Sequence, residues 1–212
     1  MIHIIKTTRR IAVAAAIALT SATAFATPVN SIDNGTFGAK TYTAGSFAYL
    51  TGAVNSWTYA GSSGIATNGS GFNVIGGAGP VGLLQQAGSS ISQVFNFTDN
   101  ILSLTFSAEG RNGYGANSIS VLIDGVALAF SGATSFLPAS TTSFTTYTSA
   151  VIALTAGNHT LSFVGNGVNG TDVTTFIDNV TLTTAVPEPV TLGLFGLGLV
   201  ALGAVRRKAK QA

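Results

Sequence analysis

The chain has 212 residues, no cysteine, few charged residues (8%) and a formal net charge of +2. The lack of cysteine excludes disulfides, thiolate metal sites, cysteine nucleophiles and a lipid-modified N-terminal cysteine. Residues 27–185 hold two cations and six acids, which gives this body a charge of −4. A nucleic-acid-binding domain needs clustered Lys and Arg to neutralise phosphates, so this function class is excluded.

Residues 1–26 have the three parts of a secretory signal peptide. Three cations lie in the first ten residues, and an apolar run follows at 11–19. Ala24 and Ala26 then supply the small residues that a signal peptidase reads. We expect an N-terminal signal helix with cleavage after Ala26. The alternative is a permanent N-terminal anchor helix, for which the apolar run is short.

The body, residues 27–185, shows period-2 alternation and no sustained helical period. Apolar residues alternate at 91–97, 102–108 and 119–123. The last of these runs leads into Asp124-Gly125, a pair typical of a two-residue β-hairpin turn. Further strands are expected at 126–130, 143–154, 159–164 and 174–182.

The N-terminal third of the body, residues 41–86, is Gly-rich and less regular, so we expect long loops and short strands there. Many short strands separated by Gly and Asn turns indicate an all-β sandwich or barrel. The body is long enough to form one domain with a substantial core.

Several segments in order resemble the galactose-binding-like jelly rolls, a group that includes carbohydrate-binding modules. Asn34-Gly35-Thr36-Phe37 resembles their N-G-x-F opening, and residues 156–161 and 176–180 resemble their later strands. The resemblance implies an antiparallel β-sandwich of the jelly-roll type. It also implies a lectin-like module that binds polysaccharide.

Asp178 is the candidate metal ligand. In the resembling modules the equivalent Asp helps to hold a structural calcium, together with a Glu just after the N-G-x-F opening. Gly38 stands in the place of that Glu here. Asp178 shares strand parity with Phe176 and Val180, which predicts that it points toward the core. The alternative to calcium is that Asp178 accepts backbone N–H bonds.

Sugar sites use aromatic rings for stacking and amides or charged groups for the hydroxyls. The aromatic residues in Gly-, Ser- and Asn-rich surroundings are Trp57, Tyr59, Tyr42, Tyr49 and Tyr114, and the polar candidates are Asn55, Gln85, Gln86, Arg111 and Asn112. From these we take Trp57, Tyr59 and Arg111 as the candidate ligand-binding residues. The alternative is that Trp57 and Tyr59 pack in the core.

No catalytic residue is expected. His159 is the one histidine after Ala26, it begins a predicted strand, and no G-x-S-x-G motif occurs. Glu109 is the one glutamate of the body and has no evident carboxylate partner for glycoside hydrolysis. We therefore expect a protein that is not an enzyme.

Residues 186–212 read as a C-terminal sorting segment. Pro187-Glu188-Pro189 precedes an apolar stretch at 190–205, and a basic cluster at 206–208 follows. Sixteen helical residues span roughly 24 Å, less than a bilayer core of about 30 Å. The basic cluster should stay cytoplasmic, which leaves the body outside the inner membrane.

These three parts in order resemble the PEP-CTERM sorting signal of Gram-negative bacteria. The resemblance implies a short transmembrane helix, transient residence in the inner membrane and cleavage near Pro187-Glu188-Pro189 by an exosortase. It further implies delivery to the cell surface or to the exopolysaccharide matrix of a biofilm. We therefore expect an exported structural protein of the surface or matrix, with the lectin-like module as the alternative. A plain tail anchor is the other interpretation of the segment.

Overall fold

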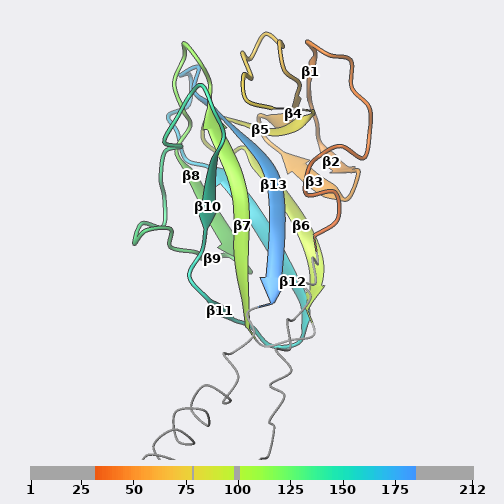
Figure 1. The fold of residues 1–212 in the computed structure, drawn as a ribbon, viewed down its shortest axis with the longest axis vertical. Coiled ribbons are helices and arrows are strands. Elements are labelled where there is room, and N and C mark those ends of the chain that lie inside the picture. Colours follow the sequence, from red (N-terminus) through yellow and green to blue (C-terminus); the bar gives the residue numbers. More distant parts are fainter. Residues whose placement is uncertain (1–31, 78, 98–100, 185–212) are drawn as a thin grey trace, which may run out of the picture. The chain divides into compact units, whose positions relative to one another are not determined.

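The computed structural model describes residues 32–184 except 78 and 98–100 (Figure 1). The strands of the first half are β1 (Phe47–Tyr49), β2 (Gly52–Val54), β3 (Trp57–Ala60), β4 (Ser63–Ala66), β5 (Val81–Gln85) and β6 (Ser90–Phe97). Those of the second half are β7 (Ile101–Gly110), β8 (Ile119–Ile123), β9 (Val126–Ala127), β10 (Thr145–Thr148), β11 (Ile152–Ala153), β12 (Gly157–Gly165) and β13 (Thr174–Thr184). The described part of the chain contains no helix.

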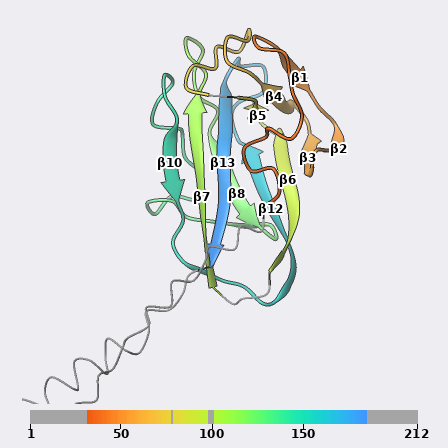
Figure 2. The same ribbon diagram turned by 45° about the vertical axis from the view of Figure 1, so that its right-hand side comes forward.

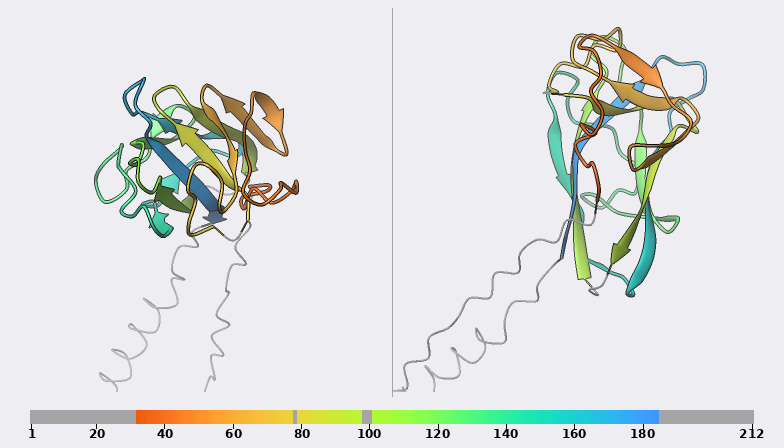
Figure 3. Two further views of the ribbon diagram at one scale, coloured as in Figure 1. Left: turned by 90° about the horizontal axis from the view of Figure 1, so that it is seen from above. Right: turned by 90° about the vertical axis from the view of Figure 1, so that its right-hand side faces the viewer.

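These strands form two antiparallel sheets that face each other. One sheet has the order β1-β4-β5-β13-β7-β10, with β11 also paired to β7, and the other has the order β2-β3-β6-β12-β8-β9. In Figure 2, β10, β7 and β13 lie in front of β8, β12 and β6, and the right-hand view of Figure 3 separates the two layers. The predicted all-β antiparallel sandwich is therefore confirmed.

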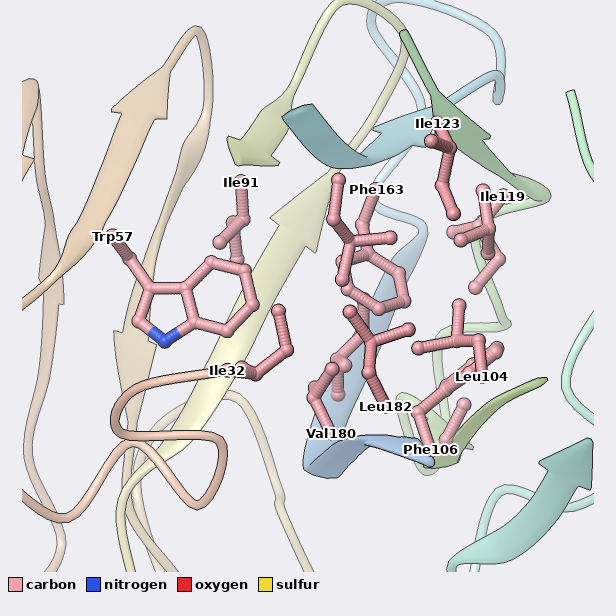
Figure 4. Packing of buried hydrophobic residues seen from close by; sticks show 14 of the residues in the cluster. Ile32, Trp57, Ile91, Leu104, Phe106, Ile119, Ile123, Phe163, Val180 and Leu182 are labelled. Carbon is pink, nitrogen blue, oxygen red and sulfur yellow. The ribbon is translucent and has the colours of Figure 1, made fainter. Parts of the chain in front are cut away.

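The predicted alternation places the core between the sheets. Leu104 and Phe106 of β7 face Ile119 of β8 and Phe163 of β12, as Figure 4 shows. Buried apolar area is the main favourable term in folding, at about 25 cal/mol per Å². The long alternating strands therefore supply most of the stability of the sandwich.

Two local predictions are confirmed by the backbone. Asp124 and Gly125 both have positive φ, 50° and 78°, and they join Ile123 to Val126 in a tight hairpin. In the N-terminal third, β1 to β4 are only three or four residues long. The strand after the Asp-Gly turn is shorter than expected, because β9 ends at Ala127.

A second, smaller apolar cluster lies on the outer face of the seven-stranded sheet. Phe176 of β13 pairs in register with Leu83 of β5, and both side chains point away from the inter-sheet core. Phe72 and Val74 of the loop between β4 and β5 cover them. This loop, residues 67–80 with residue 78 outside the description, is held against the sheet and shapes one end of the sandwich.

A β-bulge in β13 corrects the predicted orientation of Asp178. The pairing with β7 shifts register between Asp178 and Thr181, and Asn179 takes a left-handed φ of 53°. A bulge adds one residue to a strand and reverses its facing pattern. Ile177 and Val180 therefore both point into the core, while Asp178 lies on the outer face, half-buried.

None of the described residues forms a helix long and apolar enough to cross a membrane. The predicted signal helix, the signal-peptidase site at Ala24 and Ala26, and the predicted transmembrane helix lie outside the described residues. The sorting motif Pro187-Glu188-Pro189 lies outside them as well.

Candidate functional site

Trp57 and Tyr59 are core residues, which corrects their assignment as ligand-binding rings. Both side chains point inward from β3 and are 0% and 2% exposed. The Trp57 ring stacks on Phe37 at 5.1 Å between centroids, and its Nε1 donates to the carbonyl of Asn34 at 2.9 Å. The polar neighbours in sequence suggested a loop, but strand alternation turns both rings between the sheets, as Figure 4 shows for Trp57.

Arg111 lies directly after β7, on the outer face of the seven-stranded sheet, and its side chain is nearly buried. Its guanidinium lies between two rings, with the central carbon 4.5 Å from the centroid of Phe72 and 3.7 Å from that of Tyr114. One terminal nitrogen donates to the carbonyl of Gly71 at 3.0 Å, and the other donates to the carboxylate of Asp172. Arg111 thus joins the loop before β5 to the loop before β13.

A line of polar side chains continues from this ion pair across the sheet. Gln85 at the end of β5 donates from Nε2 to Asp172 Oδ1 at 2.8 Å, and it accepts a hydrogen bond from the Tyr49 hydroxyl. Both contacts of Asp172 use Oδ1. The second oxygen, Oδ2, has no hydrogen bond from any described residue, and the carboxylate is half-exposed.

Three aromatic rings beside this polar line face solvent. Tyr114, Tyr49 and Phe47 are 54%, 49% and 46% exposed, and Phe72 lies beneath them. The rings of Phe47, Tyr49 and Phe72 contact one another edge to face, with centroids 4.7 to 6.0 Å apart. We call the set formed by Phe47, Tyr49, Phe72, Gln85, Arg111, Tyr114 and Asp172 the Arg111 site.

The Arg111 site lies at the upper end of the sandwich in Figure 2, where β7 ends and β13 begins. Burial raises the pKa of Tyr49, and the nearby Asp172 carboxylate adds to the rise while Arg111 opposes it, so Tyr49 is a neutral phenol at physiological pH. Exposed rings can stack on an apolar ligand face, and the free carboxylate oxygen can accept hydrogen bonds.

The sequence had marked Tyr49, Gln85, Arg111 and Tyr114 as aromatic or polar candidates, and the structure brings these four together. Phe47, Phe72 and Asp172 were missed. Phe47 could have been found, because it shares one strand face with Tyr49 at two residues' spacing. Asp172 offers no such signal, since it joins the site through the long-range pairing of β13 with β5 and β7.

His159 is held between two acceptors. Its Nδ1 lies 2.6 Å from Asp124 Oδ2, and its Nε2 lies 2.7 Å from the carbonyl oxygen of Thr155. The Asp124 hydrogen bond raises the pKa of His159, and the same contact lowers the pKa of Asp124. With both ring nitrogens engaged, the imidazole is placed as a structural ion-pair partner, and neither nitrogen is left to accept a proton from a serine.

Glu109 is fully buried on the outer face of β7. Its two carboxylate oxygens accept from the backbone N–H groups of Ile75 and Gly76 at 3.2 and 3.0 Å. Burial raises the pKa of Glu109, and these two hydrogen bonds partly offset the rise. A carboxylate used in this way fastens the loop between β4 and β5 and does not face a cleft.

Asp178 accepts a hydrogen bond from the backbone N–H of Asn179 at 2.7 Å, and burial raises its pKa to about 6. Calcium binds six to eight oxygens, usually from several carboxylates. The described residues contain no cluster of three or more His, Cys, Asp or Glu, and Gly38 brings no carboxylate to Asp178. Among the described residues, Asp178 thus lacks the grouped carboxylates that calcium sites usually have.

Comparison with known proteins gives one result for the C-terminal segment and another for the β-sandwich. Residues 185–208 match the family described as "PEP-CTERM protein-sorting motif". The match includes Pro187-Glu188-Pro189 and confirms the resemblance drawn from the sequence. This motif indicates export and sorting through the membrane in Gram-negative bacteria. A search among curated proteins finds no match.

Among solved structures, the chain is similar to TmCBM61 in complex with β-1,4-galactotriose, at 14% identity and a TM-score of 0.50, over 74% of this chain and 99% of that one. The CBM36-1 domain of a multidomain xylanase from the hindgut metagenome of Trinervitermes trinervoides is 19% identical, with a TM-score of 0.48, over 62% and 94%. A CBM36 module in complex with calcium and xylotriose is 16% identical, with a TM-score of 0.42, over 60% and 98%. These neighbours are carbohydrate-binding modules with jelly-roll folds, and at such identities the likeness concerns the fold.

Proposed function

We propose that this protein is an exported, non-enzymatic structural protein of the cell surface or exopolysaccharide matrix. The observation that carries the proposal is the match of residues 185–208 to the sorting motif. In this proposal the chain has a signal peptide at 1–26, a β-sandwich at 27–185 and a sorting segment at 186–212. An exosortase cuts at Pro187-Glu188-Pro189 after the segment has held the chain transiently in the inner membrane.

The mature mass of the protein tests this processing. We expect the surface protein from normal cells to lack the residues that follow the Pro-Glu-Pro motif, and cells without the exosortase to retain them. Replacing Glu188 with Ala in normal cells should have the same effect as loss of the enzyme. An intact C-terminus on the surface protein of normal cells would contradict processing and would favour a lasting tail anchor.

A second function, carbohydrate binding by the β-sandwich, is favoured by the Arg111 site. Exposed Tyr49 and Tyr114 offer ring faces, and Asp172 Oδ2 offers an acceptor for hydroxyl groups. An apolar surface with a few placed polar groups is the usual form of a small-ligand site. This function is compatible with the first, because a matrix protein that binds polysaccharide is thereby retained in the matrix.

A polysaccharide pull-down with the full chain in mild detergent tests this binding. We expect retention on at least one insoluble or immobilised polysaccharide, and loss of retention when Tyr114 is replaced by Ala. Leu137→Ala is the control, because Leu137 is equally exposed and lies outside the Arg111 site. Equal retention of both variants would remove the Arg111 site as the binding surface.

A further inference from the structure

The charges of the Arg111 site are paired with each other. Arg111 is the one cation of the site, and its guanidinium donates to Asp172 and to the Gly71 carbonyl while its two faces lie against Phe72 and Tyr114. Both terminal nitrogens of the guanidinium therefore donate within the protein, and the side chain is 7% exposed. An anionic ligand finds no accessible positive charge here.

No other cation of the described residues belongs to the Arg111 site, where it could bind an anionic ligand. Lys40 is the other cation in this stretch, and its Nζ lies 5.4 Å from the ring centroid of Tyr42, a residue that packs against the inter-sheet core. The other charged groups of the described residues are acids and His159, whose two ring nitrogens are held by Asp124 and the Thr155 carbonyl. A polyanion approaching the Arg111 site thus finds no cation in the site besides the paired Arg111.

The charged atom that remains free in the site, Asp172 Oδ2, is a hydrogen-bond acceptor, and the hydroxyl of the exposed Tyr114 can donate or accept. Gln85 uses its oxygen for Tyr49 and one of its two N–H groups for Asp172, which leaves one N–H to donate. Asp172 Oδ2 is open, and the Tyr49 oxygen retains lone pairs after donating its hydrogen. Sugar hydroxyl groups both donate and accept, so they match this mixed set, whereas carboxylates and sulfates bring charged acceptors that the Asp172 carboxylate repels.

We propose that the Arg111 site selects uncharged, hydroxyl-rich polysaccharides and rejects polyanions such as uronate or sulfated polymers. The inference rests on the proposed carbohydrate-binding function and adds the chemical class of the ligand. The rings of Tyr49, Tyr114 and Phe47 stack on the apolar faces of sugar rings, and Asp172 Oδ2 accepts from their hydroxyl groups. Because the charges of Arg111 and Asp172 cancel within the site, a cationic polymer gains little as well.

Affinity electrophoresis of the full chain in mild detergent tests this selectivity with polysaccharides matched in backbone and different in charge. The pairs are hydroxyethyl cellulose with carboxymethyl cellulose, dextran with dextran sulfate, carboxyl-reduced with native polygalacturonate, and glycol chitin with glycol chitosan. At about 0.15 M salt, which weakens the attraction of polyanions to the seven cations of residues 1–10 and 206–210, we expect retardation by the neutral members. Their anionic partners should bind more weakly by about 10-fold or more, since the site offers them no unpaired cation.

Two single-charge variants make the test specific. Asp172→Asn leaves Arg111 without its anionic partner, so we expect the ratio of anionic to neutral affinity to rise by about 10-fold. Asp33→Asn removes the same charge from an exposed residue outside the site and should leave that ratio unchanged.

The outcomes separate the two proposals. Stronger retardation of the unmodified chain by the anionic members overturns the charge selectivity while leaving carbohydrate binding in place, and this comparison does not depend on the folding of any variant. A folded Asp172→Asn variant with an unchanged ratio overturns the part assigned to the ion pair. No retardation by any member of any pair overturns carbohydrate binding itself.

Discussion

The two faces of strand β7 differ in chemistry from Leu102 to Glu109. On the inner face, alternate residues from Leu102 to Ala108 lie fully buried between the sheets. On the outer face, the alternate residues are Ser103, Thr105, Ser107 and Glu109, and Arg111 follows them. Because successive side chains of a strand point to opposite faces, one strand serves both the core and the Arg111 site.

This difference between the inner and outer faces separates the residues that determine stability from those that determine binding. The inner face is apolar, so its side chains contribute through burial and close packing. The outer face is polar and its groups satisfy one another, as in the hydroxyl pairs Ser103–Thr183 at 3.3 Å and Thr105–Thr148 at 3.2 Å. Substitutions inside should therefore change stability, and substitutions outside should change binding or the pH dependence of stability.

The largest expected effect is at Trp57, which belongs to the core. Trp57→Ala should lower the free energy of unfolding of the full chain by about 3–5 kcal/mol, because it opens a cavity against Phe37 and removes one of the two donors to the Asn34 carbonyl. Denaturant unfolding followed by circular dichroism measures the change. A stable Trp57→Ala variant that has lost polysaccharide retention would break the division between core and outer face.

The next largest effect, on binding, is expected at Tyr114 in the Arg111 site on the outer face. Tyr114→Ala should weaken binding to a neutral polysaccharide by about 10-fold or more, as removal of a central tyrosine often does. Its stability should fall by only about 0.5–1 kcal/mol, the usual worth of a cation–π contact such as the one with Arg111. Affinity electrophoresis and thermal unfolding of the same sample give both numbers.

Unchanged binding by Tyr114→Ala would contradict the assignment. Leu137→Ala serves as the matched control, because it truncates an equally exposed side chain elsewhere and should alter neither number. Together, the Trp57 and Tyr114 variants form a crossed pair, in which each should move one measurement much more than the other.

Most of the fold could be predicted from the sequence, because its long strands follow a simple rule. Alternating apolar residues in β6, β7 and β8 identify the inner faces, and Asp124-Gly125 identifies the hairpin. The rule fails at the bulge, where an extra residue at left-handed Asn179 turns Val180 into the core while Asp178 stays on the outer face with Phe176. Asn adopts the left-handed conformation more readily than most residues, but an Asn in a strand does not by itself predict a bulge.

The Arg111 site could be predicted only in part, because its members come from five separate segments. Composition pointed to Tyr49 and Tyr114 but equally to Trp57, since all three lie among Gly, Ser and Asn. What separates them is the face of the sheet on which each ring lies, and sheet order and register decide that. Asp172 enters the site through contacts more than 60 positions away along the chain.

A smaller effect is expected at Asp178, the half-buried acid of the outer face. Burial raises its pKa to about 6 in the folded state, above the ordinary value of 3.8. The folded chain therefore binds this proton more tightly, and the associated stability is present below about pH 3.8 and lost as the pH rises through 6. Asp178→Asn should be more stable than the unmodified chain at pH 8 by about 1–2 kcal/mol, after allowance for solvent screening.

Melts at pH 5 and pH 8 in EDTA, with Asp33→Asn as the matched control, measure this difference. Because Asp178 lacks grouped carboxylates among the described residues, replacing EDTA by excess calcium should leave the melting midpoint of the unmodified chain unchanged. A large rise of that midpoint with calcium, lost in Asp178→Asn, would show instead that the carboxylate holds the ion.

The smallest effect is expected at His159, a polar residue on the inner face near the start of β12. There the ring bridges the turn at Asp124 and the carbonyl of Thr155, so both nitrogens donate when the ring is protonated. The raised pKa of His159 makes its contribution full below about 6.5 and lost as the pH rises through the higher folded value. The lowered pKa of Asp124 makes its contribution present above about 3.8 and lost on acidification through the lower folded value.

The His159–Asp124 pair should therefore stabilise the fold most between about pH 4 and 6.5, by about 0.2–1 kcal/mol, since Asp124 is half-exposed. His159→Gln should flatten the pH profile of the melting midpoint in this window and leave polysaccharide retention unchanged, because the Arg111 site lies at the other end of the sandwich. A His159 resonance, assigned by its loss in His159→Gln, that titrates near 6.5 in the folded chain would show that the doubly bonded imidazolium does not form. A loss of polysaccharide retention in His159→Gln would show that the His159–Asp124 pair and the Arg111 site are coupled. Because these two sites lie at opposite ends of the sandwich, such a result would contradict the separation of stability from binding where it should be clearest.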